Sequence, residues 1–129
     1  MEKLEIKEIL LKLKFNINSK GFEYWIQAIH LYTTFNEQIK MTELYEQLAF
    51  EFITNANVIE RNMQTASKTA HKNIQEYFNY DNKITNKVIL QLFRFYEEMK
   101  VNGWRNTRET TRTIFNNTNR GWIFRNTKV

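Results

Sequence analysis

Residues 55–72 read NANVIERNMQTASKTAHK, and the spacing of their apolar side chains predicts an amphipathic helix. At 3.6 residues per turn, one stripe of this helix holds Ile59, Met63, Ala66 and Ala70. The opposite face carries polar side chains, several of which can donate or accept two hydrogen bonds at once: Asn57, Glu60, Arg61, Gln64, Thr65 and Lys68. A helix that only had to be soluble would more often carry Glu and Lys there, so this face is a candidate recognition surface.

The residues before this helix predict a shorter helix that joins it through a tight turn. Thr42 is expected to cap the shorter helix, which ends near Phe52. Its inward-facing side chains are expected to be Leu44, Leu48, Ala49 and Phe52. The side chains expected to stay in water are Glu43, Glu46 and Glu51. The turn is ITNAN, residues 53–57, and Asn57 with Glu60 three residues later gives a capping signature for the longer helix.

A short helix, a turn and a longer helix form the helix-turn-helix arrangement, whose second helix enters the major groove of DNA. The motif needs a small residue where the two helices approach, which is Ala49, and an apolar anchor, which Ile59 and Met63 supply. Ile53 and Thr54 stand where the motif usually has a glycine. The pattern alone therefore leaves open a helical pair that packs in a bundle without binding DNA.

The rest of the sequence favours one all-α domain. A chain of 129 residues can build one domain with a core, and the absence of proline and the presence of only three glycines favour long helices. Further helices are expected over about residues 2–14, 20–36, 74–78 and 85–100. The expected fold class is an all-α bundle of five to six helices that contains the helix-turn-helix.

Three of these helices have recognisable apolar positions. The first has an apolar stripe of Leu4, Ile6, Ile9, Leu10 and Leu13. The last has an inner stripe of Val88, Leu92, Phe95, Tyr96 and Met99. The helix over 20–36 is apolar on most sides, so we expect it at the centre of the core, with Ser19 as its cap.

The sequence lacks the residues that several classes of function require. The chain has no cysteine, which excludes disulfides, thiolate metal sites and a cysteine nucleophile. His30 and His71 have no partner at ligand spacing, and no glycine-rich phosphate loop occurs. The first residues lack the unbroken apolar core of a signal peptide, and no stretch is apolar enough to span a membrane. We therefore expect a cytoplasmic binding protein and no enzyme, with no cofactor, metal ion or membrane contact.

The formal net charge of +5 is unevenly distributed along the chain. Residues 1–100 hold thirteen Lys or Arg and thirteen Asp or Glu, whereas residues 101–129 hold six Lys or Arg against one Glu. We therefore expect a helix-turn-helix domain over 1–102 and a basic tail, rich in Asn, Thr and Arg, over 103–129. The phosphate-binding candidates in the tail are Arg105, Arg108 and Arg112. The alternatives are a solubilising end or a segment docked by its aromatic residues.

The segments SKGFEYWIQAIHLY (19–32) and MTELYEQLAFEFITNANVIERNMQTASKTAHK (41–72) resemble the DNA-binding effector domain of the stage-zero sporulation master regulator of endospore-forming bacteria. The resemblance covers about residues 5–100, and its matching residues are Lys20, Gly21, Phe22, Ala28, Ile29, Leu44, Tyr45, Ala49, Phe52, Thr54, Ala56, Glu60, Arg61, Thr85 and Asn86. It implies a six-helix fold built round a helix-turn-helix. It also implies that Glu60 and Arg61 read bases, because the family's base-contacting pair matches at these positions.

The chain departs from that family in two respects. The family's regulator carries an amino-terminal receiver domain that is phosphorylated on an aspartate, and 129 residues leave no room for one, so phosphorelay control is not expected. The family also places more basic residues along the recognition helix, where this chain has Val58 and Gln64. Because of this difference in the recognition helix, we expect either a different target sequence or no DNA target.

The side chains of the candidate recognition surface have the chemistry to read base edges. Arg61 can pair with O6 and N7 of guanine, and Asn57 and Gln64 can each pair with N6 and N7 of adenine. Glu60 can accept a hydrogen bond from N4 of cytosine, and Thr65 can contact the methyl group of thymine. Further along the helix, Lys68 and Lys72 are expected to contact DNA phosphates.

The main alternative is a solvated surface without a ligand, on which Glu60 and Gln64 form only an i,i+4 pair. The acidic residues of the shorter helix favour this alternative, because they would repel phosphate if they faced it.

We expect a sequence-specific double-stranded DNA-binding protein that regulates transcription. One short recognition helix rarely gives high affinity alone, so we expect a homodimer or tandem copies on repeated sites. One alternative is a protein-binding module or inhibitor on the same scaffold. Another is a DNA-binding accessory protein in replication or plasmid transfer.

Overall fold

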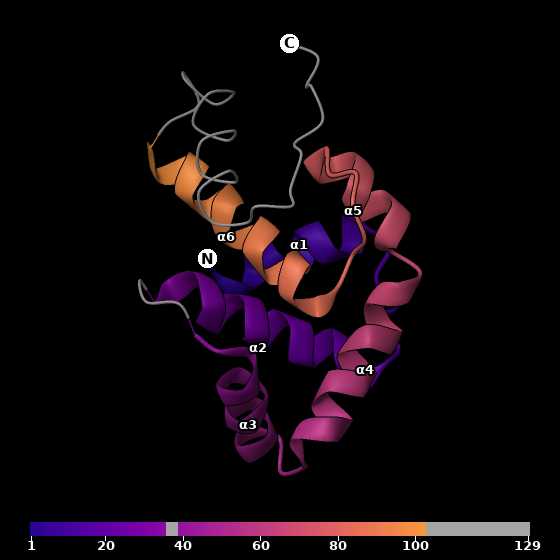
Figure 1. Cartoon of the computed structure of the whole chain (residues 1–129), viewed down its shortest axis with the longest axis vertical. Coiled ribbons are helices and arrows are strands. Elements are labelled where there is room, and N and C mark those ends of the chain that lie inside the picture. Colours follow the sequence, from indigo (N-terminus) through magenta and orange to yellow (C-terminus); the bar gives the residue numbers. More distant parts are fainter. Residues whose placement is uncertain (36–38, 103–129) are drawn as a thin grey trace.

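The computed structural model describes residues 1–35 and 39–102, which form six α-helices and no strand (Figure 1). The helices are α1 (Lys3–Lys12), α2 (Lys20–Thr34), α3 (Met41–Glu51), α4 (Ala56–Lys68), α5 (His71–Phe78) and α6 (Asn86–Asn102). The prediction of an all-α fold with five to six helices is confirmed. The expected phosphate-binding arginines of the tail, Arg105, Arg108 and Arg112, lie outside the described residues.

α2 forms the centre of the core, as its apolar composition predicted. Figure 1 shows it crossing the middle of the molecule, and it contacts α1, α3, α4 and α6. Trp25, Ala28 and Ile29 in α2 have no exposed surface. Ser19 is the N-cap residue, as predicted, but its hydroxyl donates to the Asn16 carbonyl oxygen at 2.9 Å instead of bonding to the helix.

Three helices end in the left-handed backbone conformation without a glycine. The residues in this conformation are Lys14, Ile53 and Asn79, with φ of 68°, 55° and 57°. At the end of α3, the Thr54 N–H donates to the Ala49 carbonyl at 2.9 Å and the Ile53 N–H donates to the Phe50 carbonyl at 3.4 Å. This pair of bonds is the Schellman motif, which usually has a glycine at the position of Ile53. The turn therefore has the expected geometry, although it lacks the expected residue.

The start of α3 and two apolar positions differ from the sequence predictions. The N-cap residue of α3 is Lys40, so the prediction that Thr42 caps this helix was wrong, and Thr42 lies inside the first turn. Leu4 is 69% exposed, because it lies on the side of α1 opposite the buried Ile6. Phe52 is 38% exposed, since it follows the last turn of α3, and its ring packs edge-on against Tyr24.

α6 contributes more side chains to the core than those of its predicted stripe. Leu92, Phe95 and Met99 are buried as expected, whereas Val88 and Tyr96 are only half-buried. The fully buried side chains outside the predicted stripe are Ile89, Leu90 and Phe93. The reason is that α6 packs against both α2 and α4, so it buries a wider face than one stripe.

Candidate nucleic-acid interface

The helix-turn-helix is formed by α3 and α4, which meet at a tight turn (Figure 1). The side-chain oxygen of Asn55 accepts a hydrogen bond from the Val58 N–H at 3.0 Å, so Asn55 caps α4. The prediction that Asn57 caps α4 was wrong, because Asn57 lies within the first turn, where its side chain is exposed. This correction leaves Asn57 available on the outer surface of the helix.

The inner face of α4 is held firmly against α2. The predicted stripe is completely buried at Ile59, Met63, Ala66 and Ala70. The indole N–H of Trp25 donates to the Met63 carbonyl oxygen at 2.8 Å. A Cβ atom on Gly21 would stand 2.0 Å from the Asn62 carbonyl oxygen, so the two helices approach closely only because residue 21 has no side chain. These contacts fix how α4 presents its outer face.

The outer face of α4 exposes every side chain that the sequence assigned to it. The exposed residues are Asn57, Glu60, Arg61, Gln64, Thr65 and Lys68. Within residues 1–35 and 39–102, Arg61 forms no ion pair and no hydrogen bond joins Glu60 to Gln64. The Thr65 hydroxyl donates to the Arg61 carbonyl at 3.0 Å, so its polar atom bonds to its own helix. We call these six side chains the outer face of α4.

α4 is shorter than the sequence predicted. It ends at Lys68, and α5 begins at His71, so the prediction of one helix up to residue 72 was wrong. The Ala70 N–H bonds to the Ser67 carbonyl three residues back, at 2.8 Å, and this tightened turn ends the helix. Lys72 is exposed, but it belongs to α5 and not to α4.

Asn86, at the start of α6, joins the two helices of the helix-turn-helix. It is 6% exposed, and its amide nitrogen donates to the Tyr45 hydroxyl at 3.1 Å and to the Glu60 carbonyl at 3.4 Å. Burial raises the pKa of Tyr45, the Asn86 hydrogen bond opposes this rise, and the charge of Glu60 adds to it. Asn86 was not among the site residues predicted from the sequence, although Thr85 and Asn86 both belong to the residues that match the family.

The exposed face of α3 carries negative charge and an apolar end. The exposed acidic side chains are Glu43, Glu46 and Glu51, as predicted. Phe50 is 86% exposed and Ile53 is 93% exposed. This part of the helix-turn-helix therefore does not have the charge of a phosphate-binding surface.

A cavity of about 360 Å³ opens beside the last turn of α4. Its lining consists of Gln64, Ser67, Lys68, His71, Lys83, Ile84, Thr85 and Asn86, none of which is acidic. The Ser67 hydroxyl is buried, 3.3 Å from the Gln64 carbonyl oxygen and 3.5 Å from Nε2 of His71. Burial lowers the pKa of His71, and the nearby charge of Lys68 lowers it further.

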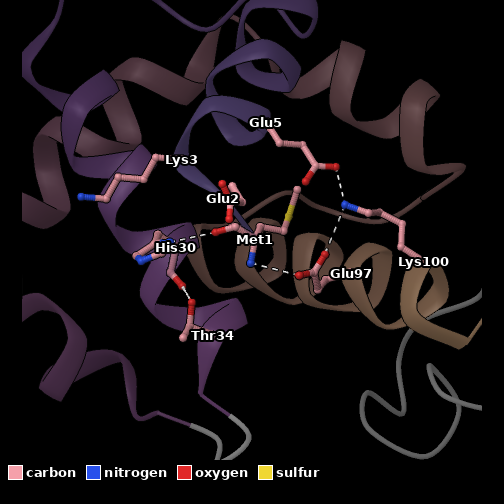
Figure 2. A pocket seen from close by; sticks show the side chains of 8 residues that line it. All are labelled: Met1, Glu2, Lys3, Glu5, His30, Thr34, Glu97 and Lys100. Carbon is pink, nitrogen blue, oxygen red and sulfur yellow. Dashed lines mark hydrogen bonds and ion pairs between the residues drawn. The ribbon is translucent and has the colours of Figure 1, made fainter.

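A second cavity, of about 440 Å³, lies between α1, α2 and α6, and its charged groups largely bind one another (Figure 2). The terminal ammonium of Met1 lies 3.0 Å from the Glu97 carboxylate, and the Lys100 ammonium contacts both Glu5 and Glu97. A ring nitrogen of His30 bonds with the Met1 carbonyl oxygen at 2.8 Å. Burial alone would raise the pKa of Glu97, but Met1 and Lys100 outweigh this effect and lower it. These contacts join the start of the chain and α1 to α2 and to α6.

In residues 1–35 and 39–102, no group of three or more His, Asp or Glu side chains could hold a metal ion. No helix in these ranges has both the length and the apolar character that crossing a membrane requires.

The sequence model of the family described as "Sporulation initiation factor Spo0A C terminal" matches residues 6–96. The match includes the whole of α2, α3, α4 and α5, and therefore the complete helix-turn-helix. No curated protein and no solved structure matches the chain. The family consists of DNA-binding domains of transcription regulators and is not a family of enzymes. The chain therefore belongs to the Spo0A C-terminal family of all-helical DNA-binding domains.

Proposed function

We propose that the protein binds double-stranded DNA with sequence specificity and that α4 is its recognition helix in the major groove. The outer face of α4 carries this proposal, because its side chains are exposed and have hydrogen-bonding groups that suit base edges. The contacts of Trp25 and Gly21 with the back of α4 support it further. A helix that recognises base edges needs such a fixed support, since small displacements would misalign its hydrogen bonds.

Each side chain of the outer face has a chemically suitable base. Arg61 pairs with guanine, Asn57 and Gln64 pair with adenine, and Glu60 accepts from cytosine. Thr65 contacts a thymine methyl group, which fits its hydroxyl being bonded to the Arg61 carbonyl, so that its own methyl group remains for DNA. Each good bidentate pair contributes about 1–3 kcal/mol of discrimination.

Phosphate contacts come from cations at the end of the recognition helix and in the tail. In this proposal Lys68 and Lys72 bind the backbone next to the bases that α4 reads. Arg105, Arg108 and Arg112 bind phosphates from a tail over residues 103–129, separate from the domain over 1–102. Removal of residues 104–129 should weaken binding to all duplexes by similar factors and flatten the dependence of log affinity on log salt. An unchanged salt dependence would contradict the role of the tail.

The protein acts in the cytoplasm, as a homodimer or as tandem copies on repeated sites. One recognition helix covers only a few base pairs, so a second copy supplies the affinity that a single α4 lacks. Sedimentation tests the number of bound copies. It measures the molar mass of the complex on a duplex with one copy of the site and on a duplex with two.

A protein partner is the second candidate, and the exposed apolar end of α3 favours it. Phe50 and Ile53 expose most of their apolar surface, and the exposed acidic residue Glu51 lies between them in the sequence. Exposed apolar side chains rimmed by charge are typical of surfaces that bind proteins.

Selection of binding sites from random duplexes tests the proposed function. An enriched motif supports recognition by α4, whereas a flat pool contradicts it and favours the protein partner. The same selection with Arg61→Ala should return a motif relaxed at one position. Glu46→Gln is the matched control on α3, and it should return the original motif.

A further inference from the structure

We propose that the cavity beside the last turn of α4 binds one backbone phosphate of the DNA. This inference rests on the proposed function of α4 and deepens it, because it assigns a DNA contact to the loop between α5 and α6. The new contact residues are Lys83 and Thr85, which lie more than a dozen residues beyond α4 in the sequence.

The donors of the cavity suit a phosphate, whose oxygens accept hydrogen bonds and carry negative charge. Lys68 comes from α4 and Lys83 from the loop, and each ammonium supplies three donors. In the described part of the chain neither lysine forms an ion pair, so an anion would not have to displace a carboxylate. Thr85 accepts a hydrogen bond from the Val88 N–H at 3.2 Å, which leaves its hydroxyl proton for a ligand oxygen.

The position of the cavity matches the path of a DNA backbone beside the recognition helix. Gln64 lies on the outer face of α4 and also lines the cavity, and Lys68 follows one turn later. A duplex whose bases meet Arg61 and Gln64 must place its backbone near one end of α4, because phosphates border the groove that the helix enters. The cavity lies at the carboxyl-terminal end.

The wall that the loop contributes is already fixed in the protein without DNA. Asn86 ties the start of α6 to the Tyr45 hydroxyl and to the Glu60 carbonyl, and Ile84 is buried in the core. Lys83 and Thr85 flank Ile84, so their backbone has a fixed position relative to α4. A preformed site of this kind binds its ligand with little ordering cost.

His71 provides a local probe of the site. Burial and then the charge of Lys68 lower its pKa, which shows that additional positive charge is disfavoured there. A bound phosphate would oppose the effect of Lys68 and raise the pKa of His71, because a nearby negative charge favours the protonated ring.

The first experiment removes one charge from the loop of the full chain. Lys83→Gln should reduce the slope of log affinity against log salt by about 0.9, the value for one phosphate contact. Affinity at low salt should fall several-fold on all duplexes, and the preferred sequence should not change. Lys7→Gln is the matched control, since Lys7 is exposed on α1 and does not line the cavity. Equal slopes for the two variants would overturn the proposal.

The result can be separated from a failure of the proposed function. If Arg61→Ala relaxes site preference while Lys83→Gln behaves like Lys7→Gln, α4 reads DNA and the cavity is not a phosphate site. If Lys83→Gln flattens the salt slope while Arg61→Ala leaves the preference intact, the phosphate site stands and base reading by α4 is wrong.

The second experiment separates a DNA phosphate from a free one. The NMR signals of the His71 ring are followed as a duplex, or inorganic phosphate alone, is added to the protein. We expect a shift with the duplex that Lys83→Gln reduces, and little shift with millimolar inorganic phosphate. A shift with inorganic phosphate and none with the duplex would overturn the assignment to the DNA backbone and show a site for a free anion.

Discussion

Gly21 in α2 lies against the backbone of Asn62 in α4, so closely that a Cβ atom at residue 21 would stand 2.0 Å from the Asn62 carbonyl oxygen. The same atom would stand 2.8 Å from Cβ of Ala66. One turn later in α2, Trp25 donates its indole N–H to the Met63 carbonyl. α4 is therefore supported at two successive points of α2, and both supports act on its backbone.

Substitution of Gly21 should destabilise the domain strongly. In Gly21→Ala the new methyl group meets a backbone carbonyl, which cannot move without displacing α4, so we expect a loss of about 3 kcal/mol in the free energy of unfolding. Urea denaturation of both proteins measures the loss. Lys20→Ala, at the exposed neighbouring position, should change stability by less than about 0.5 kcal/mol. A Gly21→Ala variant as stable as Lys20→Ala would show that α2 and α4 do not pack this closely.

Ile53→Gly should stabilise the protein. A β-branched residue at φ 55° carries a conformational cost of about 1–2 kcal/mol, which glycine removes at an entropic cost of about 0.5–1 kcal/mol. Because Ile53 is 93% exposed, its removal costs little buried surface. The expected net gain is up to about 1 kcal/mol in thermal or urea unfolding. Ile53→Ala keeps a Cβ atom and should gain less, so an equal gain from both variants would assign the effect to the loss of an exposed apolar side chain.

Arg61→Ala should change recognition without changing stability. Arg61 is exposed and forms no ion pair with the described residues, so its removal should leave the unfolding curve almost unchanged. Affinity for the selected site should fall by about 1–3 kcal/mol, and preference at one guanine should relax. Binding to duplexes that vary this base measures both quantities. Lys40→Ala, before α3, is the control, and an Arg61→Ala variant that keeps the preference would refute the assigned role.

The free energy of unfolding should depend on pH through His71. Because the folded protein lowers the pKa of His71, the unfolded chain binds a proton first as the pH falls below about 6.5. His71 therefore contributes nothing above this pH, and stability declines as the pH falls towards the lower pKa of the folded state. Urea denaturation at several pH values measures the decline, which His71→Gln should remove. Persistence of the same decline in His71→Gln would assign it to another group.

The loss of the Glu97 contacts begins at a lower pH than the decline from His71. The pKa of Glu97 is lowered in the folded state, so its contribution is present above about 4.5 and is lost as the pH falls below that value. The decline that remains in His71→Gln below about pH 4.5 therefore includes the contribution of Glu97.

Features that follow from the spacing of residues within one helix could be predicted from the sequence. Contacts between segments that are distant in the sequence could not. The stripe of Ile59, Met63 and Ala66 follows from helical spacing alone, and so does the polar face opposite to it. The hydrogen bond from Trp25 to Met63 joins residues 38 positions apart, and no local pattern encodes such a partner. The cavity beside α4 was missed for the same reason, because three separate segments line it.

The errors at helix ends have a different cause. Asn55 and Asn57 are both good caps by residue type, and only the backbone of the turn decides that Asn55 is used. The absence of a glycine weakened the helix-turn-helix prediction, but the chain places Ile53 in the left-handed conformation and completes the Schellman motif without one. Sequence rules describe which residues are preferred at such positions, whereas the fold can tolerate a less favourable residue.

Asn86 also has a consequence for the exchange of amide protons with solvent. Its bonds to Tyr45 and to the Glu60 carbonyl join α6 to both helices of the helix-turn-helix, so these three elements should open only when the whole domain unfolds. α5 has eight residues and buries only Ile74 and Phe78, so its amides should exchange at a lower free energy. Lys72 lies in α5, so the segment that carries it can open and close many times while α4 stays folded.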